Sequence, residues 1–214
     1  SQAIELNPKL AEAYLNRGGA KQTKGDLEGA IADENQAIEL NPKLAEAYFN
    51  RGLAKSTKGD LEEAIADFNQ AIELNPKLGA AYLNRGLAKQ TKGDVEGAIE
   101  DDNQAIELNP KFAAAYLNRG QVKQTKGDLE GAIADDDQAI GLNPKLADAY
   151  YGRGIAKQTK GDFDSAIADF DEAIALHPKL VEGYINRGFA KRNKGELKGA
   201  FSDFNEAILL DPKF

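Results

Sequence analysis

Apolar residues recur along the chain at the spacing of an amphipathic helix. Leu27, Ala30, Ile31, Ala37 and Ile38, for instance, follow steps of three, four and seven residues and therefore fall on one helical face. Stretches of this kind alternate with short turns that contain glycine or proline, and the positions between the apolar residues are mostly polar. The pattern predicts an all-α chain of short amphipathic helices, each with one face to bury.

The helical pattern repeats with a strict period of 34 residues. The prolines mark the period: Pro8, Pro42, Pro76, Pro110, Pro144, Pro178 and Pro212. A fixed period of this length indicates a solenoid, in which each unit buries its apolar face by stacking on its neighbours. We divide the chain, as one continuous solenoid domain, into a partial repeat over residues 1–10 and full repeats over 11–44, 45–78, 79–112, 113–146, 147–180 and 181–214.

Local signals predict two helices in each repeat. Asn7-Pro8 is typical of a helix N-cap followed by proline at the first helical position, and the helix is then expected to run to about Lys24. Gly25-Asp26 predicts the end of that helix and the start of the next, because glycine tolerates the left-handed conformation and aspartate accepts hydrogen bonds from free N–H groups.

The repeat resembles that of the tetratricopeptide repeat family. In the first full repeat the matching residues are Tyr14, Gly18, Ala30, Ala37 and Pro42, and the other five repeats follow the same pattern. The resemblance covers the entire chain. It implies a right-handed α-solenoid (superhelix) of antiparallel helix pairs, with the first helices lining a concave surface, and a role in binding proteins or peptides. The 35-residue pentatricopeptide family, which binds RNA, is disfavoured by the strict step and the acidic charge.

Several positions carry a charged residue where the family pattern has leucine or tyrosine. Arginine replaces the usual leucine before the glycine at Arg17, Arg51, Arg85, Arg119, Arg153 and Arg187. Lysine replaces the later tyrosine at Lys21, Lys55, Lys89, Lys123, Lys157 and Lys191. The facing helix carries an acid at Asp33, Asp67, Asp101, Asp135, Asp169 and Asp203. We therefore predict Arg–Asp ion pairs along the stack, within or between repeats.

The position after this aspartate alternates between aromatic and acidic residues. It is Phe in three repeats and an acid in the others: Glu34, Phe68, Asp102, Asp136, Phe170 and Phe204. Asp135-Asp136-Asp137 is a poor candidate for a metal site, because consecutive residues on a helix point in different directions.

One face of the first helices is a candidate peptide-binding surface, which we call the first-helix strip. Its asparagines are Asn16, Asn50, Asn84, Asn118 and Asn186. Its other members are Phe49, Leu53, Leu83, Leu87, Leu117, Gln121, Tyr151, Ile155 and Phe189. Asparagine can pair with both the N–H and the C=O of an extended peptide. The alternative is that the recurrence reflects recent duplication, since repeats 11–44 and 45–78 differ at only five of 34 positions.

Composition narrows the chemistry that we expect. The 27 Lys+Arg against 35 Asp+Glu give a net charge of −8, which disfavours nucleic acid as a partner. The absence of cysteine excludes disulfides and thiolate metal sites, and the single His177 is expected to replace an N-cap asparagine. We identify no catalytic set, no cofactor motif, no membrane-spanning run and no signal peptide, so a non-enzymatic, cytoplasmic protein is expected.

These observations leave three functional hypotheses open. The leading one is a scaffold that binds an extended peptide or protein segment in the concave groove; the others are a self-assembling structural array and a regulatory segment of a larger enzyme. The last repeat has no further helix after it, so we expect Ala207, Ile208 and Leu210 to be partly uncovered. Uncapped solenoid ends also suggest homo-oligomerisation.

Overall fold

The computed structural model describes residues 10–213, and all regular structure within this range is α-helical. The helices are α2 (Ala11–Thr23), α3 (Leu27–Leu40), α4 (Ala45–Lys58), α5 (Leu61–Leu74), α6 (Gly79–Thr91), α7 (Val95–Leu108), α8 (Ala113–Lys126), α9 (Leu129–Leu142), α10 (Ala147–Thr159), α11 (Phe163–Leu176), α12 (Val181–Asn193) and α13 (Leu197–Leu210). The two helices predicted for each full repeat are thus confirmed. The predicted partial repeat and the Asn7-Pro8 cap lie outside the described residues, apart from Leu10.

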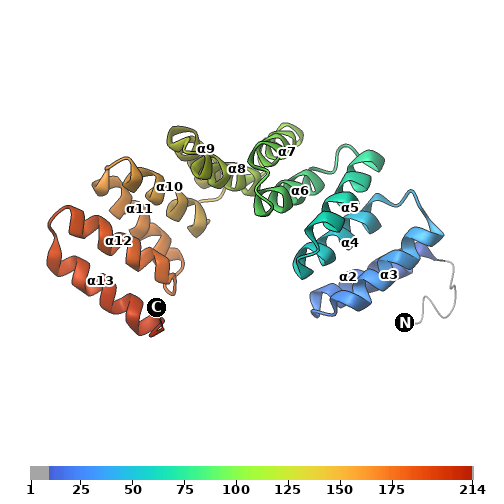
Figure 1. Cartoon of the computed structure of the whole chain (residues 1–214), viewed down its shortest axis with the longest axis horizontal. Helices are drawn as coiled ribbons and strands as arrows, with labels where there is room; N and C mark the ends of the chain where they lie inside the picture. The colour runs from blue at the N-terminus through green and yellow to red at the C-terminus, as the bar shows by residue number, and fades with distance from the viewer. Residues whose placement is uncertain (1–9, 214) are drawn as a thin grey trace. The chain divides into compact units, whose positions relative to one another are not determined.

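Consecutive helices pack as hairpins, one hairpin per repeat, in an all-α solenoid (Figure 1). The chain forms two compact units, one containing α2–α7 and ending at Pro110, the other containing α8–α13 and beginning at Lys111. Each unit holds three hairpins, and the second helix of a hairpin packs on the first helix of the next one in its unit. The helices within a unit therefore bury apolar residues against their sequence neighbours, as a repeat solenoid requires.

The two helices of a repeat make different contacts with the adjacent repeats of their unit. First helices touch one another, α2 on α4 and α4 on α6 in one unit, α8 on α10 and α10 on α12 in the other. The described second helices make no such contacts with each other. Within each unit the first helices are accordingly closer together and line the inner, concave side, in agreement with what the family resemblance implied.

The predicted glycine–aspartate turns are confirmed. Gly25 and its equivalents all have φ between 80° and 91°, in the left-handed region that glycine tolerates best. Asp26 then accepts a hydrogen bond of 2.9 Å from the backbone N–H of Gly29, which caps the start of α3. The same cap forms at Asp94, Asp128 and Asp162. Asp60 makes no such cap, and neither does Glu196, which stands at this position in the last repeat. The left-handed glycine is therefore common to all six turns, and the aspartate cap forms in four of them.

The predicted role of Asn-Pro as a helix start is wrong in the described repeats. Asn41 ends α3, and the next helix begins at Ala45 after Leu44, whose side chain makes no cap. The Asn41 side chain instead accepts a hydrogen bond of 3.1 Å from the backbone N–H of Lys43. Asparagine forms such local turns as readily as it caps helices, and a turn here places proline outside the helix. His177 likewise ends α11 and does not begin a helix.

Alanine supplies most of the core between the helices. In the second repeat Ala47, Ala54, Ala64 and Ala71 are all fully buried. Small side chains at these crossings allow the helices to approach closely, and each repeat therefore has room for only one large interior side chain. Phe68 and Phe170 are the largest side chains that are fully buried.

Candidate functional site

An ion-pair triad joins the two helices of every repeat. In the first repeat Arg17 donates two hydrogen bonds to Asp33, of 2.7 Å from Nε and 2.6 Å from Nη2. Lys21, one turn further along α2, lies 2.9 Å from the same carboxylate, and Asp33 is only 3% exposed. The same arrangement recurs in all repeats, so the predicted Arg–Asp pairs are confirmed within repeats.

The arginine of the triad has two further contacts. Its guanidinium lies over the tyrosine one turn earlier, with 5.4 Å from Arg17 to the centroid of the Tyr14 ring. In later repeats it also reaches the preceding repeat, and Arg51 donates a 2.7 Å hydrogen bond to Asn35. Arg187 does the same to Asp171. The predicted pairing between repeats is thus confirmed as well, and arginine, unlike lysine, has enough donors for all these partners.

In the first repeat the triad keeps Asp33 ionised despite its burial. Burial opposes the charge on Asp33, but hydrogen bonds from Arg17 and Lys21 outweigh it and hold the pKa of Asp33 below its ordinary value. The pKa of the Arg153 guanidinium is raised, mainly because it donates hydrogen bonds to Asp169. Burial opposes this rise, and a further hydrogen bond to Asp137 adds to it. The triad of the first repeat is therefore a charged, hydrogen-bonded cross-link, and the same hydrogen-bonded arrangement recurs in the other repeats.

The residue after the triad aspartate occupies what we call the interior position: Glu34, Phe68, Asp102, Asp136, Phe170 and Phe204. Where it is Phe, the ring lies against a glycine of the first helix. A Cβ atom at Gly52 would lie 2.7 Å from Cε1 of Phe68, and the ring of Phe49 packs on Phe68 at a centroid distance of 6.0 Å. Only glycine leaves space for the aromatic ring at this crossing.

Where the interior position is acidic, a carboxyl group lies in the same apolar space. Glu34 is 1% exposed, and its Oε1 accepts a long hydrogen bond of 3.5 Å from Asn50, while Oε2 has no partner among the described residues. Burial is the main cause that raises the pKa of Glu34 to about 8. Burial, together with the neighbouring charge of Asp135, raises the pKa of Asp136 to about 8. Both groups are therefore mostly neutral at pH 7.

The three consecutive aspartates of α9 point to different surroundings, as predicted. Asp135 belongs to the triad with Arg119 and Lys123, and Asp136 is buried at the interior position. Asp137 is exposed and pairs with Arg153 of the next repeat. They do not converge, and no cluster of potential metal ligands occurs within residues 10–213.

The asparagines of the first-helix strip lie near the junctions between repeats. Asn50 reaches Glu34 of the preceding repeat, and Asn186 donates a 3.0 Å hydrogen bond to the hydroxyl of Tyr151 in the preceding repeat. Asn84 bonds to the carbonyl of Ala80 in its own helix at 2.8 Å. Asn118 is buried, whereas Asn16 is exposed. Asn50 and Asn84 thus each donate one hydrogen bond from the side-chain amide, whereas Asn186 donates two, the second of 2.9 Å to the backbone carbonyl of Glu182.

The other members of the strip differ in how accessible they are. Leu87 is 39% exposed and Phe189 is 36% exposed, and Gln121 is exposed at the equivalent position. Partly buried members are Phe49, Leu53, Leu117, Tyr151 and Ile155, while Leu83 is buried. The strip is thus a mostly apolar row along the first helices of each unit, in which both the apolar residues and the asparagines range from buried to exposed.

The amino-acid sequence did not reveal that Glu34 and Asp136 have raised pKa values. The alternation of acid and Phe was visible at Glu34 and Phe68. The glycine that both repeats have at the helix crossing, Gly18 and Gly52, would have indicated that Glu34 takes the buried position of Phe68. The expected exposure at the end of the chain is confirmed for Ile208, which is 56% exposed, and for Leu210 at 37%. It is wrong for Ala207, which is 3% exposed because that side of α13 faces α12.

The helical-hairpin repeat and its 34-residue period define an α-solenoid repeat protein. Models of the tetratricopeptide repeat match residues 45–78, 147–180 and 181–214, and a model described as TPR repeat matches residues 20–59, 91–127 and 125–161. The chain belongs to the tetratricopeptide repeat family.

Solved structures with the same fold include several repeat proteins. MamA is 29% identical, with a TM-score of 0.69 over 76% of this chain and 95% of that chain. YrrB, described as a TPR protein with an unusual peptide-binding site, is 26% identical, with a TM-score of 0.68 over 85% of this chain and 94% of that chain. PilF of Pseudomonas aeruginosa is 16% identical, with a TM-score of 0.85 over 95% of this chain and 93% of that chain, and this likeness concerns the fold alone. No curated protein matches the sequence.

None of the helices between residues 10 and 213 is both long and apolar enough to cross a membrane.

Proposed function

We propose that this protein is a non-enzymatic scaffold that binds an extended peptide segment along the concave side of its first helices. The observation that carries the proposal is the accessible apolar row of the first-helix strip, with Leu87 and Phe189 its most exposed apolar members. Tetratricopeptide repeats generally mediate protein–protein interaction, and YrrB is described as having a peptide-binding site.

The chemistry of the strip favours a peptide that combines apolar and hydrogen-bonding groups. Apolar side chains of the ligand would lie on Leu53 and Leu87, where burial contributes about 25 cal/mol per Å². Asn50 and Asn84 each donate one amide N–H to a group described above. A side-chain amide has two N–H groups and a carbonyl in all, which match the N–H and C=O of a peptide backbone. Neighbouring helices pack about 8–10 Å apart, and an extended chain rises about 3.3 Å per residue, so successive repeats would contact roughly every third residue.

A test uses a displayed library of random peptides selected against the full chain. Peptides that bind the wild type are then measured against Leu53→Asp/Leu87→Asp, which places charge on the strip. The matched control is Ala32→Asp/Ala66→Asp, which adds the same charges at exposed sites on α3 and α5. Circular dichroism melting checks that both variants fold.

We expect the Leu53→Asp/Leu87→Asp variant to bind the selected peptides at least tenfold more weakly than the wild type, and the Ala32→Asp/Ala66→Asp control to bind them equally well. Equal affinity in the strip variant, or a loss confined to the control, would refute binding along the first helices. An Asn50→Ala/Asn84→Ala variant then measures the contribution of the amides separately.

A further inference from the structure

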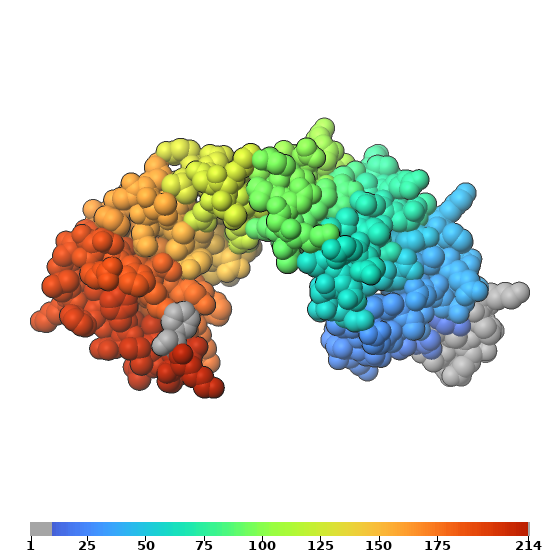
Figure 2. Space-filling model, in the orientation of Figure 1, coloured from blue at the N-terminus to red at the C-terminus, as the bar shows by residue number. Residues whose placement is uncertain are grey.

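The asparagine of the first-helix strip is missing from one repeat, where Gly152 of α10 takes its place. The equivalent residue in the first unit, Asn50, donates a hydrogen bond to Glu34, the interior acid of the preceding repeat. Gly152 follows the interior acid Asp136 of α9 at the same separation of 16 residues. The helices α9 and α10 pack on each other in the second unit (yellow to orange in Figure 2). At this junction the chain therefore lacks the amide that Glu34 receives from Asn50.

The carboxyl group of Asp136 is buried between two glycines. A Cβ atom at Gly120 of α8 would lie 3.1 Å from its Oδ1, and one at Gly152 would lie 3.0 Å from its Oδ2. Asp136 is only 2% exposed, and Oδ1 has no hydrogen-bond partner among the described residues. The three atoms nearest to the Cβ position at Gly152 all belong to this carboxyl group. Asp136 is thus directed toward the space that a side chain at residue 152 would fill.

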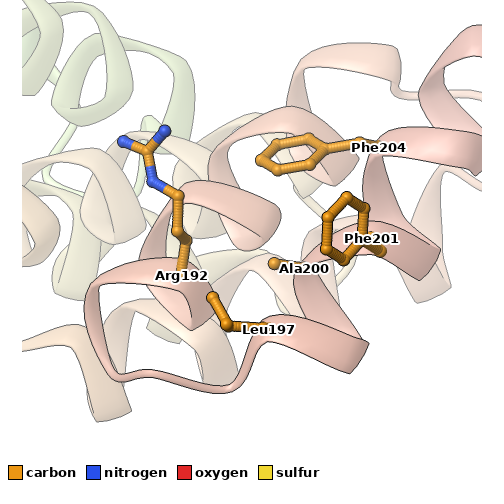
Figure 3. Close-up of a pocket in the computed structure, with 5 residues that line it drawn as sticks. All are labelled: Arg192, Leu197, Ala200, Phe201 and Phe204. Carbon is orange, nitrogen blue, oxygen red and sulfur yellow. The ribbon is translucent and has the colours of Figure 1, made fainter.

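The other interior residues do not create this situation. In the last repeat the interior Phe204 lies beside an apolar pocket of about 60 Å³, lined also by Leu197, Ala200, Phe201 and Arg192 (Figure 3). An aromatic ring needs no hydrogen-bond partner, whereas a buried carboxyl group costs free energy until a donor pairs with it. Of the three interior acids in the sequence, only Asp136 is followed 16 residues later by glycine in place of asparagine.

Acidic side chains flank Gly152 on the first-helix strip. Asp148 lies one turn before it on the same face of α10 and is exposed. Glu182 of α12 is exposed as well. Burial, and after it the charge of Glu182, raises the pKa of Tyr151, so this carboxylate lies near the hydroxyl of the residue next to Gly152. The surroundings of Gly152 therefore favour a positively charged ligand group.

The polar side chains of α10 beside Gly152 have partners other than Asp136. The Tyr151 hydroxyl accepts a hydrogen bond of 3.0 Å from Asn186 of α12. Arg153 and Lys157 both bind Asp169 of α11. These contacts direct the three side chains toward α11 and α12, and a donor for Asp136 is left for a ligand to supply.

We propose that the concave side binds its peptide ligand with a lysine side chain that passes over Gly152 and donates a hydrogen bond to the carboxyl group of Asp136. The inference rests on the proposed peptide binding and adds the residue type that the second unit selects. Lysine has a slender stem that suits the space of a missing side chain, and its charge is attracted by Asp148 and Glu182. A ligand amide would reproduce the contact of Asn50 but would gain little from these charges, and the guanidinium of arginine is wider.

This pairing should make lysine selection depend on pH. Asp136 has a pKa of about 8, so it becomes a carboxylate as the pH rises toward that value, while a lysine ammonium stays charged. The charged groups around it are Asp135 and Asp137 on its own helix, Arg119 and Lys123 of α8, which bind Asp135, Arg153 of α10 and Asp169 of α11. Selection of lysine is therefore expected to strengthen between pH 6 and 8.

The test starts from peptides that are selected against the full chain from a displayed random library. Each lysine of a selected peptide is replaced in turn by norleucine and by glutamine, and fluorescence anisotropy measures the affinities at pH 6 and 8. The protein variants are Gly152→Asn, which supplies the missing amide, and Asp136→Asn, which removes the charge. The matched control is Gly141→Asn, the same substitution at an exposed site of α9 with no atom near its Cβ position. Circular dichroism melting checks that the variants fold.

At pH 8 the wild type is expected to bind the lysine peptide about five- to twentyfold more tightly than the norleucine and glutamine peptides, and at pH 6 about threefold more tightly at most. Gly152→Asn and Asp136→Asn should remove this preference and leave the affinity for the norleucine peptide unchanged, while Gly141→Asn should retain the preference. Selected peptides without lysine, equal affinities for the three peptides, or a preference that persists in Gly152→Asn overturn the proposal and leave peptide binding intact.

Failure of the proposed function gives a different result, because no peptide is then selected at all. In that case n-butylammonium is the probe, and carbon-detected NMR follows the carboxyl signal of Asp136. The probe should lower the pKa of Asp136 in the wild type but not in Gly152→Asn, and tetramethylammonium, which has the same charge and no N–H, should leave it unchanged. Equal effects of the two cations would overturn the ammonium site.

Discussion

The first and second repeats share one charged framework and differ in what they bury inside it. Both have the arginine–lysine–aspartate triad and a glycine at the helix crossing, yet Glu34 occupies the interior position of one and Phe68 that of the other. The difference shows that the triad and the turns determine the hairpin, while the interior residue determines how much apolar burial stabilises it. A neutral acid is tolerated at the interior position, but burial of an aromatic ring there stabilises the folded protein more.

The largest effect is expected when the aromatic interior is removed. Phe68→Ala should lower the free energy of unfolding by about 3–5 kcal/mol, because it leaves a cavity beneath Gly52 that the surrounding helices fill only in part. Denaturant unfolding followed by circular dichroism measures the change. Phe204→Ala is the matched control at the partly uncovered end position and should cost clearly less; an equal cost would contradict the role of burial.

A smaller gain is expected when the first repeat is converted to the second type. Glu34→Phe places a ring against Gly18 as Phe68 lies against Gly52, and it should raise the free energy of unfolding by about 1–3 kcal/mol at pH 7. Asn50 loses its partner Glu34 and is expected to bond to the backbone carbonyl four residues earlier, as Asn84 does above Phe68. Thermal and denaturant unfolding of the variant measure the gain, and a loss of stability would show that the two repeats differ in more than the interior residue.

The pH dependence of stability should separate the two acids of the first repeat. Glu34 has a folded-state pKa of about 8 against an ordinary value of 4.5, so it contributes stability that is fully present below pH 4.5. That contribution falls by about 1.4 kcal/mol per unit as the pH rises from 4.5 to 8. Asp33 has a lowered pKa and acts in the opposite sense, losing its contribution only as the pH falls below its ordinary range near 3.8.

Denaturant unfolding of the wild type and of Glu34→Gln between pH 5 and 8 isolates the first of these effects. The free energy of unfolding of the wild type, relative to that of Glu34→Gln, should fall steadily as the pH rises through this range. A constant difference would mean that Glu34 titrates alike in the folded and the unfolded protein.

Periodic features were predictable from the sequence because the same physical cause acts six times. The glycine turns need a left-handed residue, and the Arg17–Asp33 pairing follows from charges that face each other across one hairpin. Asn-Pro was misassigned because the dipeptide suits a turn as well as a helix start, and only the packing of α4 decides between them. The state of Glu34 depends on burial beneath the next repeat, and that burial is a property of the stack and not of any single repeat.

The central claim is that Glu34 and Asp136 are mostly neutral in the folded protein at pH 7. Carbon-detected NMR of the side-chain carboxyl groups, recorded from pH 3 to 9, tests it directly, with Glu34→Gln and Asp136→Asn to assign the two signals. The account predicts that Glu34 and Asp136 titrate near pH 8 while Asp33 titrates below its ordinary value. Titration of Glu34 and Asp136 near pH 4 would contradict it.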